Sequence, residues 1–295
     1  MTEISAEQAY RALQRRAREE RRGTEELLIF YAHEGFLRRL SMSRHRENLV
    51  LKGGMLLAVL DARRPTRDAD LSVHGLPNDE ASIRQILSKI AQFASADGLT
   101  FDTAKISTTP MREGAEYDGV RVTLPASLAT AKLKVQLDLS FGDPVEAREI
   151  SYPTLLDDQD ITMLGYPVEL TLAEKIATMM SRGRANTRER DFADVAVLSR
   201  IQTIDADKLH SALQRTANHR RHPITALGDT LDGHAPARQS AWTALRQRSG
   251  LDTLPADFSE VVDEVVRFVD PLVESNGNLG PWTPEAGRWS TSTDA

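Results

Sequence analysis

The sequence contains no cysteine, which excludes a disulfide scaffold, a thiol nucleophile and a zinc–thiolate site. It also has no apolar run near the roughly 20 residues that span a bilayer. The first residues do not combine a basic segment with a following apolar one, so no signal peptide is expected. These absences fit a reducing compartment, and we expect a cytoplasmic protein with no membrane partner.

The composition is that of an ordinary globular chain with an acidic balance. A net charge of -6 argues against a protein coated in nucleic acid, although a local basic surface is compatible with it. The 295 residues allow one large or two modest domains. The hydrophobic patterns predict two helices and a mixed sheet in residues 1–150, then a helical domain in residues 151–274, and a disordered tail in residues 275–295. The expected fold class is therefore α+β.

One stretch, residues 48–73, carries most of the recognisable chemistry. Residues 48–52 are expected to form a short strand, and Gly53 and Gly54 a turn that opens a helix to about Asp61. Two glycines at a helix N-terminus let a phosphate approach backbone N–H groups at the positive end of the helix dipole. The pattern predicts a phosphate-binding turn.

Three carboxylates are expected to share a site next to this turn. Side chains alternate along a strand, so Asp68 and Asp70 of the strand over residues 68–73 lie on one face. A second strand, residues 133–141, alternates perfectly and carries Asp138 on its polar face. Two or three carboxylates in this arrangement suit divalent cations and displacement at a nucleotide phosphate. A pair of aspartates two apart also occurs at solvated strand ends, and that alternative stays open at this point.

These motifs, together with Glu174-Lys175 and Arg190-Asp191-x-x-Asp194 in two later helices, resemble those of the AbiEii/AbiGii toxin family. The resemblance covers about residues 49–200. It implies a nucleotidyltransferase of the polymerase-β-like superfamily, with a nucleotidyltransferase domain followed by a helical one. It also implies a toxin that a separately encoded antitoxin neutralises. Many members carry Ser or Thr directly after the two glycines, where this chain has Met55.

The resemblance assigns roles to individual residues. The catalytic set is Asp68, Asp70, Asp138, Lys175 and Asp191. The first three of these, Asp68, Asp70 and Asp138, would hold two Mg²⁺ ions. Lys175 resembles a triphosphate-binding lysine, and Asp194 is a weaker candidate beside Asp191. The residues expected to contact the nucleoside triphosphate are Lys52, Gly53, Gly54, Arg64, Thr66 and Lys175.

The resemblance further implies a reaction that joins a nucleotide from CTP or UTP to the 3′ acceptor end of tRNA, with release of pyrophosphate. Such a modification would block aminoacylation and translation. Two alternatives stay open: transfer of AMP or UMP to a protein hydroxyl, and a non-catalytic nucleotide-binding module. Lys175 also has a structural alternative, because a lysine beside an apolar helix stripe often only extends its charge to solvent.

Overall fold

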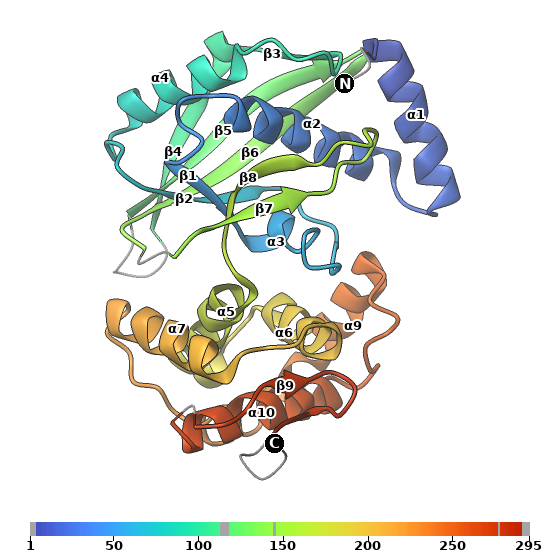
Figure 1. Ribbon diagram of the computed structural model, residues 1–295. Helices are drawn as coiled ribbons and strands as arrows, with labels where there is room; N and C mark the ends of the chain where they lie inside the picture. Colours follow the sequence, from blue (N-terminus) through green and yellow to red (C-terminus); the bar gives the residue numbers. More distant parts are fainter. Residues whose placement is uncertain (1–3, 113–117, 144–145, 277, 291–295) are drawn as a thin grey trace. The chain divides into compact units, whose positions relative to one another are not determined.

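The computed structural model describes residues 4–112, 118–143, 146–276 and 278–290 (Figure 1). Within it the chain divides into two compact units. The first comprises the residues up to Val59 and the segment Pro65–Tyr166. The second comprises Leu60–Arg64 and the residues from Pro167 onward. The short segment Leu60–Arg64 therefore belongs to the second unit, although the residues before and after it belong to the first.

The first unit is built on an eight-stranded mixed sheet with the order β3-β5-β6-β2-β1-β8-β7, in which β4 also pairs with β5. β2 runs parallel to β6, and β1 runs parallel to β8, whereas the remaining pairs are antiparallel. The strands are β1 Leu49–Lys52, β2 Ala69–Val73, β3 Leu99–Phe101, β4 Ser107–Arg112, β5 Asp118–Leu128, β6 Ala131–Phe141, β7 Arg148–Tyr152 and β8 Ile161–Gly165.

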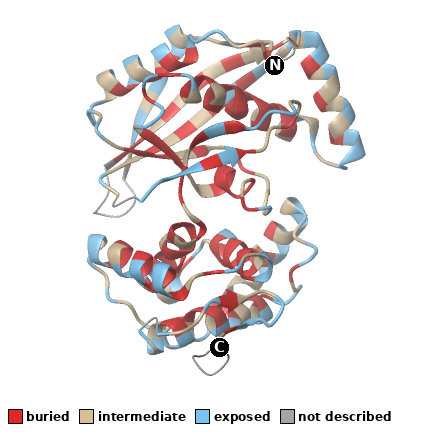
Figure 2. Ribbon diagram, in the orientation of Figure 1, coloured by how far each residue is buried: buried red, intermediate tan, exposed pale blue. Residues whose placement is uncertain are grey.

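Helices pack onto this sheet. They are α1 Ala6–Glu19, α2 Thr24–Ser41, the single turn α3 Gly53–Leu56, α4 Glu80–Ala91 and the 3₁₀ turn η1 Thr103–Lys105. Ser5 and Gln8 form a capping box at the start of α1, and the Asp79 side chain caps α4, which fixes where both helices begin. α2 packs on β6 and β8 and is buried along most of its length (Figures 1 and 2).

β6 shows how the sequence pattern sets the core. Leu133, Val135, Leu137 and Leu139 are buried, and the residues between them are exposed or only partly buried. The predicted alternation is therefore correct. Because Asp138 lies between two buried leucines, its side chain is on the opposite face from the apolar core.

The second unit is mainly helical. Its elements are α5 Val168–Arg182, η3 Gly183–Ala185, α6 Glu189–Ile201, α7 Ala206–His219, α8 Leu227–Thr230, α9 His234–Ser249, α10 Phe258–Glu274, β9 Trp282–Thr283 and β10 Arg288–Trp289. Aromatic rings fill its core: Trp242 stacks on Phe258, which in turn contacts Phe192 edge to face. No helix of the described residues in either unit is long and apolar enough to cross a bilayer. The mixed sheet followed by helices is the α+β architecture that the sequence predicts.

Two expectations about boundaries differ from the structure. The helix expected from Gly53 to Asp61 ends at Leu56, because the amides of Ala58 and Val59 bond three residues back and tighten the turn. β7 and β8 extend the sheet of the first unit, so the change of unit comes after Tyr166 rather than at residue 150.

The expected disordered tail is also wrong over residues 278–290. There β9 and β10 form a hairpin in which both tryptophans are buried. The indole N–H of Trp282 donates to the carbonyl oxygen of Ser199 at 2.7 Å, and that of Trp289 to the carbonyl oxygen of Phe268 at 2.7 Å. Two anchored aromatic side chains outweigh the Gly- and Pro-rich composition around them. Residues 291–295 lie outside the described residues.

Candidate active site

Four charged residues stand side by side across four neighbouring strands of the first unit. The register pairs Lys52 of β1 with Asp70 of β2, Asp70 with Asp138 of β6, and Asp138 with Arg121 of β5. Directly paired residues point to the same face of a sheet, so their side chains form one row, which we call the charged row. Its order is positive, negative, negative, positive.

The two carboxylates of the charged row have a third beside them. Asp68 directly precedes β2 and lies two residues from Asp70, and we call Asp68, Asp70 and Asp138 the carboxylate cluster. Burial, followed by the charge of Asp68, raises the pKa of Asp70 to about 7, and Asp138 adds to this effect. Lys52 opposes the shift but does not cancel it. At Asp70, burial and the two neighbouring carboxylates therefore outweigh the opposing charge of Lys52.

The carboxylate of Asp70 lies directly against the two glycines. Gly53 has a φ of +64°, and a Cβ atom at this position would lie 1.9 Å from the nearer Asp70 carboxylate oxygen, so no other residue fits. The amide of Gly54 donates to the same oxygen at 3.4 Å. Met55, the next residue, is fully buried, and its sulfur accepts from the Tyr152 hydroxyl at 3.9 Å. The glycine pair thus brings backbone N–H groups against the carboxylate cluster.

Thr66 positions the first carboxylate of the cluster. Its hydroxyl donates to Asp68 Oδ1 at 2.9 Å, and the residue is buried. The sequence predicts Thr66 as a contact to the nucleotide. In this structure its hydroxyl proton is committed to Asp68, which orients that carboxylate.

Asp138 is engaged by a residue that the sequence analysis missed. Arg121 donates to both carboxylate oxygens, with Nε to Oδ1 at 2.8 Å and Nη2 to Oδ2 at 2.6 Å. The alternation along β5 places Arg121 on the polar face, but only the strand register shows that it meets Asp138. Among the residues that the structure describes, no three His, Asp or Glu side chains converge as a ready-made metal site.

The chemistry of the cluster nevertheless fits a divalent cation. Carboxylate oxygens are the ligands that Mg²⁺ prefers, and adjacent parallel strands bring Asp70 and Asp138 side by side. Burial and the neighbouring carboxylates raise the pKa of Asp70, and a bound cation would relieve the repulsion between these carboxylates. Asp68 and Asp70 would supply the first ligands. Asp138 would join them once its pairing with Arg121 is exchanged.

Lys52 is held by a fourth carboxylate on the same side of the sheet. Its ammonium group lies 2.9 Å from Asp143 Oδ2 and 5.5 Å from the centre of the Tyr166 ring. The same Asp143 oxygen accepts from Ser140 at 2.6 Å, with Ser72 at 3.4 Å. Asp143 was not predicted. The local signal was an acidic residue two positions beyond a strand whose polar face already carries Asp138 and Ser140.

The remaining predicted residues form a separate cluster inside the second unit. Arg64 pairs with both oxygens of Asp194, at 2.6 and 2.9 Å. Lys175 of α5 donates to Asp194 at 2.7 Å and to Asp191 at 3.1 Å, both on α6. We call Arg64, Lys175, Asp191 and Asp194 the ion quartet. The structural alternative of a lysine reaching solvent is excluded in this structure, because Lys175 is buried.

The ion quartet balances its own charge. Burial alone would raise the pKa of Asp194, but the charges of Lys175 and Arg64 outweigh it and lower that pKa to about 2. Burial likewise acts to lower the pKa of Lys175, and the two aspartates overcome it and raise the pKa above its ordinary value. Lys175 and Asp194 therefore both stay ionised at neutral pH. Arg64, which the sequence predicts as a nucleotide contact, donates to Asp194 in this structure.

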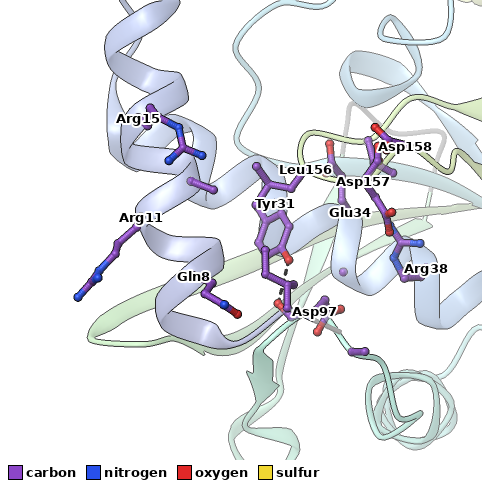
Figure 3. A pocket seen from close by; sticks show the side chains of 15 residues that line it. Gln8, Arg11, Arg15, Tyr31, Glu34, Arg38, Asp97, Leu156, Asp157 and Asp158 are labelled. Atoms are coloured by element: carbon purple, nitrogen blue, oxygen red, sulfur yellow. Dashed lines mark hydrogen bonds and ion pairs between the residues drawn. The ribbon is translucent and has the colours of Figure 1, made fainter. Parts of the chain in front are cut away.

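The first unit also contains a pocket of about 560 Å³ between α1, α2 and the loops at residues 96–97 and 154–158 (Figure 3). Its polar groups largely satisfy one another: Arg38 pairs with Asp157 at 3.3 Å, and the Tyr31 hydroxyl donates to the Asp97 carbonyl oxygen at 2.8 Å. Its described lining residues include no member of the carboxylate cluster. The pocket is therefore distinct from the carboxylate cluster.

Residues 35–264 match the family model "Nucleotidyl transferase AbiEii toxin, Type IV TA system". That span is well over half of the chain and includes every residue of the carboxylate cluster and the ion quartet. The chain belongs to the AbiEii nucleotidyltransferase family. No protein of curated function matches it.

Solved structures agree with the AbiEii assignment at the level of the fold. A crystal structure from H. pylori, provisionally described as a nucleotidyltransferase, is similar with a TM-score of 0.53 and 12% identity. That similarity covers 86% of this chain and 98% of the other. JHP933 from Helicobacter pylori is also similar, with a TM-score of 0.48 and 13% identity over 82% of this chain and 91% of the other. At such low identity the first of these supports the fold alone.

The structure of this AbiEii member thus divides the predicted site residues into two sets. Asp68, Asp70, Asp138, Lys52, Gly53, Gly54 and Thr66 gather in the first unit, whereas Lys175, Asp191 and Arg64 gather in the second. The arrangement on which the metal prediction depends, Asp138 on the same face as Asp70, is present. The individual roles of these residues stay predictions.

Proposed function

We propose that this AbiEii nucleotidyltransferase acts as a toxin that adds nucleotides from CTP or UTP to the 3′ acceptor end of tRNA, in a Mg²⁺-dependent reaction. The observation that carries the proposal is the carboxylate cluster, in which Asp70 and Asp138 stand in register beside Asp68. An acidic cluster whose charge is not balanced is suited to hold cations and the phosphates that accompany them.

In the proposed reaction the oxygen of an RNA 3′-hydroxyl attacks the α-phosphorus of the nucleotide. The bond between the α- and β-phosphates breaks, and pyrophosphate leaves with the electron pair. Asp68, Asp70 and Asp138 would hold divalent cations, which supply charge neutralisation for the triphosphate when bound. The hydroxyl proton passes to a carboxylate of the cluster, for which we propose Asp138.

Two features of the chain support binding of the triphosphate at this place. Lys52, fixed by Asp143, presents a positive charge at the edge of the carboxylate cluster. Gly53 and Gly54 bring backbone N–H groups into the site without side chains of their own, and the Gly54 N–H would reach a phosphate by exchanging its contact with Asp70. Lys175 is proposed as a further triphosphate contact, and Asp191 as a second acidic residue needed for activity. Their pairing in the ion quartet means that such a contact requires an exchange of partners.

The test is to incubate the purified protein with each of the four α-labelled nucleoside triphosphates and either total tRNA or total cell protein. We expect label at tRNA 3′ ends, with CTP or UTP as the preferred donor, and none after EDTA treatment. Asp70→Asn is the inactive control, and Asp158→Asn removes an equal charge at an exposed site of the same unit.

Each arm of this test has a distinct meaning. Label in protein rather than RNA would establish the protein-modifying alternative. Label in neither fraction, with all four nucleotides and Mg²⁺ present, would support the non-catalytic binding module. As a toxin of a type IV system the chain is also expected to need an antitoxin, and co-expression with its genetic neighbours would identify one by restored growth.

A further inference from the structure

Arg121 occupies an unusual position for a residue that lies beside a proposed metal site. It stands at the end of the charged row, directly opposite Asp138, and its guanidinium contacts both oxygens of that carboxylate at 2.6 and 2.8 Å. Its side chain is 43% exposed, whereas that of Asp138 is 11% exposed. The arginine therefore reaches the carboxylate from the solvent side of the sheet.

This pairing competes with metal binding. A guanidinium that bridges both oxygens of a carboxylate uses the in-plane lone pairs that a cation would use. An arginine side chain keeps its proton in proteins, so Arg121 does not release Asp138 by deprotonation. The carboxylate becomes available only if the guanidinium moves to another partner.

A triphosphate is a partner of the required kind. Phosphate oxygens accept the same two-pronged contact from a guanidinium that a carboxylate accepts. An ion pair that is partly open to solvent is weak compared with a buried one, so the exchange is not costly. The exposed side of Arg121 also leaves room for the side chain to swing away from β6.

We propose that Arg121 is a positioning residue that keeps Asp138 out of the metal site until an anionic substrate draws its guanidinium away. The carboxylate cluster is then completed only when a nucleotide is present, and the freed guanidinium binds a phosphate of that nucleotide. This inference rests on the proposed function, because it concerns the same site. Asp138 thus becomes available as the third metal ligand when the substrate binds, and a high metal concentration alone is not sufficient.

The proposal is tested by titrating Mn²⁺, observed by electron paramagnetic resonance, into the full-length protein and its variants. Without nucleotide, Arg121→Gln is expected to bind Mn²⁺ about tenfold more tightly than the wild type, or at one additional site. Adding a non-hydrolysable CTP analogue should bring the wild type close to Arg121→Gln. The double variant with Asp138→Asn should show no gain.

Two controls separate this mechanism from a general loss of positive charge or of structure. Arg11→Gln removes the same charge from an exposed position of α1 in the same unit and should leave Mn²⁺ binding unchanged. Circular dichroism and thermal unfolding check folding, and Arg121→Lys, which keeps the charge without the two-pronged contact, should bind Mn²⁺ with intermediate affinity. A KM for the nucleotide that rises severalfold in Arg121→Gln, while metal affinity rises without nucleotide, is a pair of opposite changes that a purely structural role would not produce.

Wild-type Mn²⁺ affinity in Arg121→Gln, while Asp70→Asn abolishes binding, would overturn the role of Arg121 and leave the metal site standing. Unchanged binding in both variants would instead overturn the proposed metal site itself. A gain in Arg121→Gln that persists in the double variant with Asp138→Asn would also reject the proposal, because the effect would then not pass through Asp138.

Discussion

The carboxylate cluster and the ion quartet are both groups of charged side chains removed from bulk water, yet they are arranged in opposite ways. The ion quartet sets two positive groups against two negative ones, and the pKa of its Asp194 falls to about 2. In the carboxylate cluster, burial and the charges of Asp68 and Asp138 outweigh the charge of Lys52 at Asp70, and the pKa of that residue rises to about 7. A balanced set stabilises its own fold, whereas an unbalanced set is held in place by the surrounding fold and remains available to a ligand.

The largest effect is expected for a substitution in the carboxylate cluster. Asp70→Asn should lower nucleotide transfer by roughly 10³- to 10⁴-fold, or about 4 to 5.5 kcal/mol of barrier, because it removes a central ligand of the proposed metal site. Initial rates with labelled nucleotide measure this loss. Thermal unfolding without metal should show that the variant is at least as stable as the wild type, since one of three repelling charges is gone. A variant that was inactive because it had unfolded would argue against the assignment.

The second-largest effect is expected for a substitution in the ion quartet. Asp194→Asn leaves the guanidinium of Arg64 and the ammonium of Lys175 short of a shared negative partner inside the second unit. Removing one member of a buried ion network costs about 3–5 kcal/mol of stability. Urea denaturation followed by circular dichroism measures it. Asp207→Asn, at an exposed position of α7, is the matched control and should cost only a few tenths of a kcal/mol.

A loss of stability below about 1 kcal/mol in Asp194→Asn would show that the quartet is not a structural element of the second unit. The ion quartet would then not differ from the carboxylate cluster as proposed, and Lys175 would become a stronger candidate for direct contact with the nucleotide.

The pH dependence of stability should have opposite signs in the two clusters. Asp194 has its pKa lowered from 3.8 to about 2, so its contribution is complete above pH 4 and is lost as the pH falls towards 2, by about 2 kcal/mol. Asp70 has its pKa raised from 3.8 to about 7, so it binds a proton more tightly in the folded state. Stability therefore decreases as the pH rises from about 4 to 7.

Unfolding free energies of the wild type and of the two asparagine variants, measured from pH 2.5 to 8, separate these contributions. The difference between the wild type and Asp194→Asn should change mainly below pH 4. The difference between the wild type and Asp70→Asn should change mainly between pH 4 and 7 and should shrink when Mg²⁺ is added. The same slope in all three proteins would contradict both assignments.

The smallest expected effect concerns Asp143, which holds Lys52 beside the carboxylate cluster. Asp143→Asn keeps the shape of the side chain but removes the charge that fixes Lys52. We expect KM for the nucleotide to rise about tenfold, equivalent to about 1.4 kcal/mol, with kcat little changed, because only the position of the ammonium group is lost. Steady-state kinetics over a range of nucleotide concentrations resolves the two constants. A fall in kcat with constant KM would assign Asp143 to the chemical step instead.

Local sequence patterns were sufficient for much of the first unit. The alternation over residues 133–141 predicted both β6 and the face that carries Asp138, because a period of two is a property of the strand itself. The starts of α1 and α4 also depend on local sequence, because the side chains of Ser5 and Asp79 satisfy the nearest free amides. The tail was mispredicted, because composition does not show that Trp282 and Trp289 find a packed surface.

The sequence by itself determined that Asp68 and Asp70 share a face, that glycines precede them, and that the family is the nucleotidyltransferases of AbiEii type. Only the tertiary structure decided that β2 lies against β6, that Arg121 pairs with Asp138, that Asp143 fixes Lys52, and that Lys175 is neutralised by Asp191 and Asp194. The reason is physical: the first set depends on the backbone geometry of neighbouring residues. The second depends on which distant segments pack together, and that is settled by the burial of the whole core.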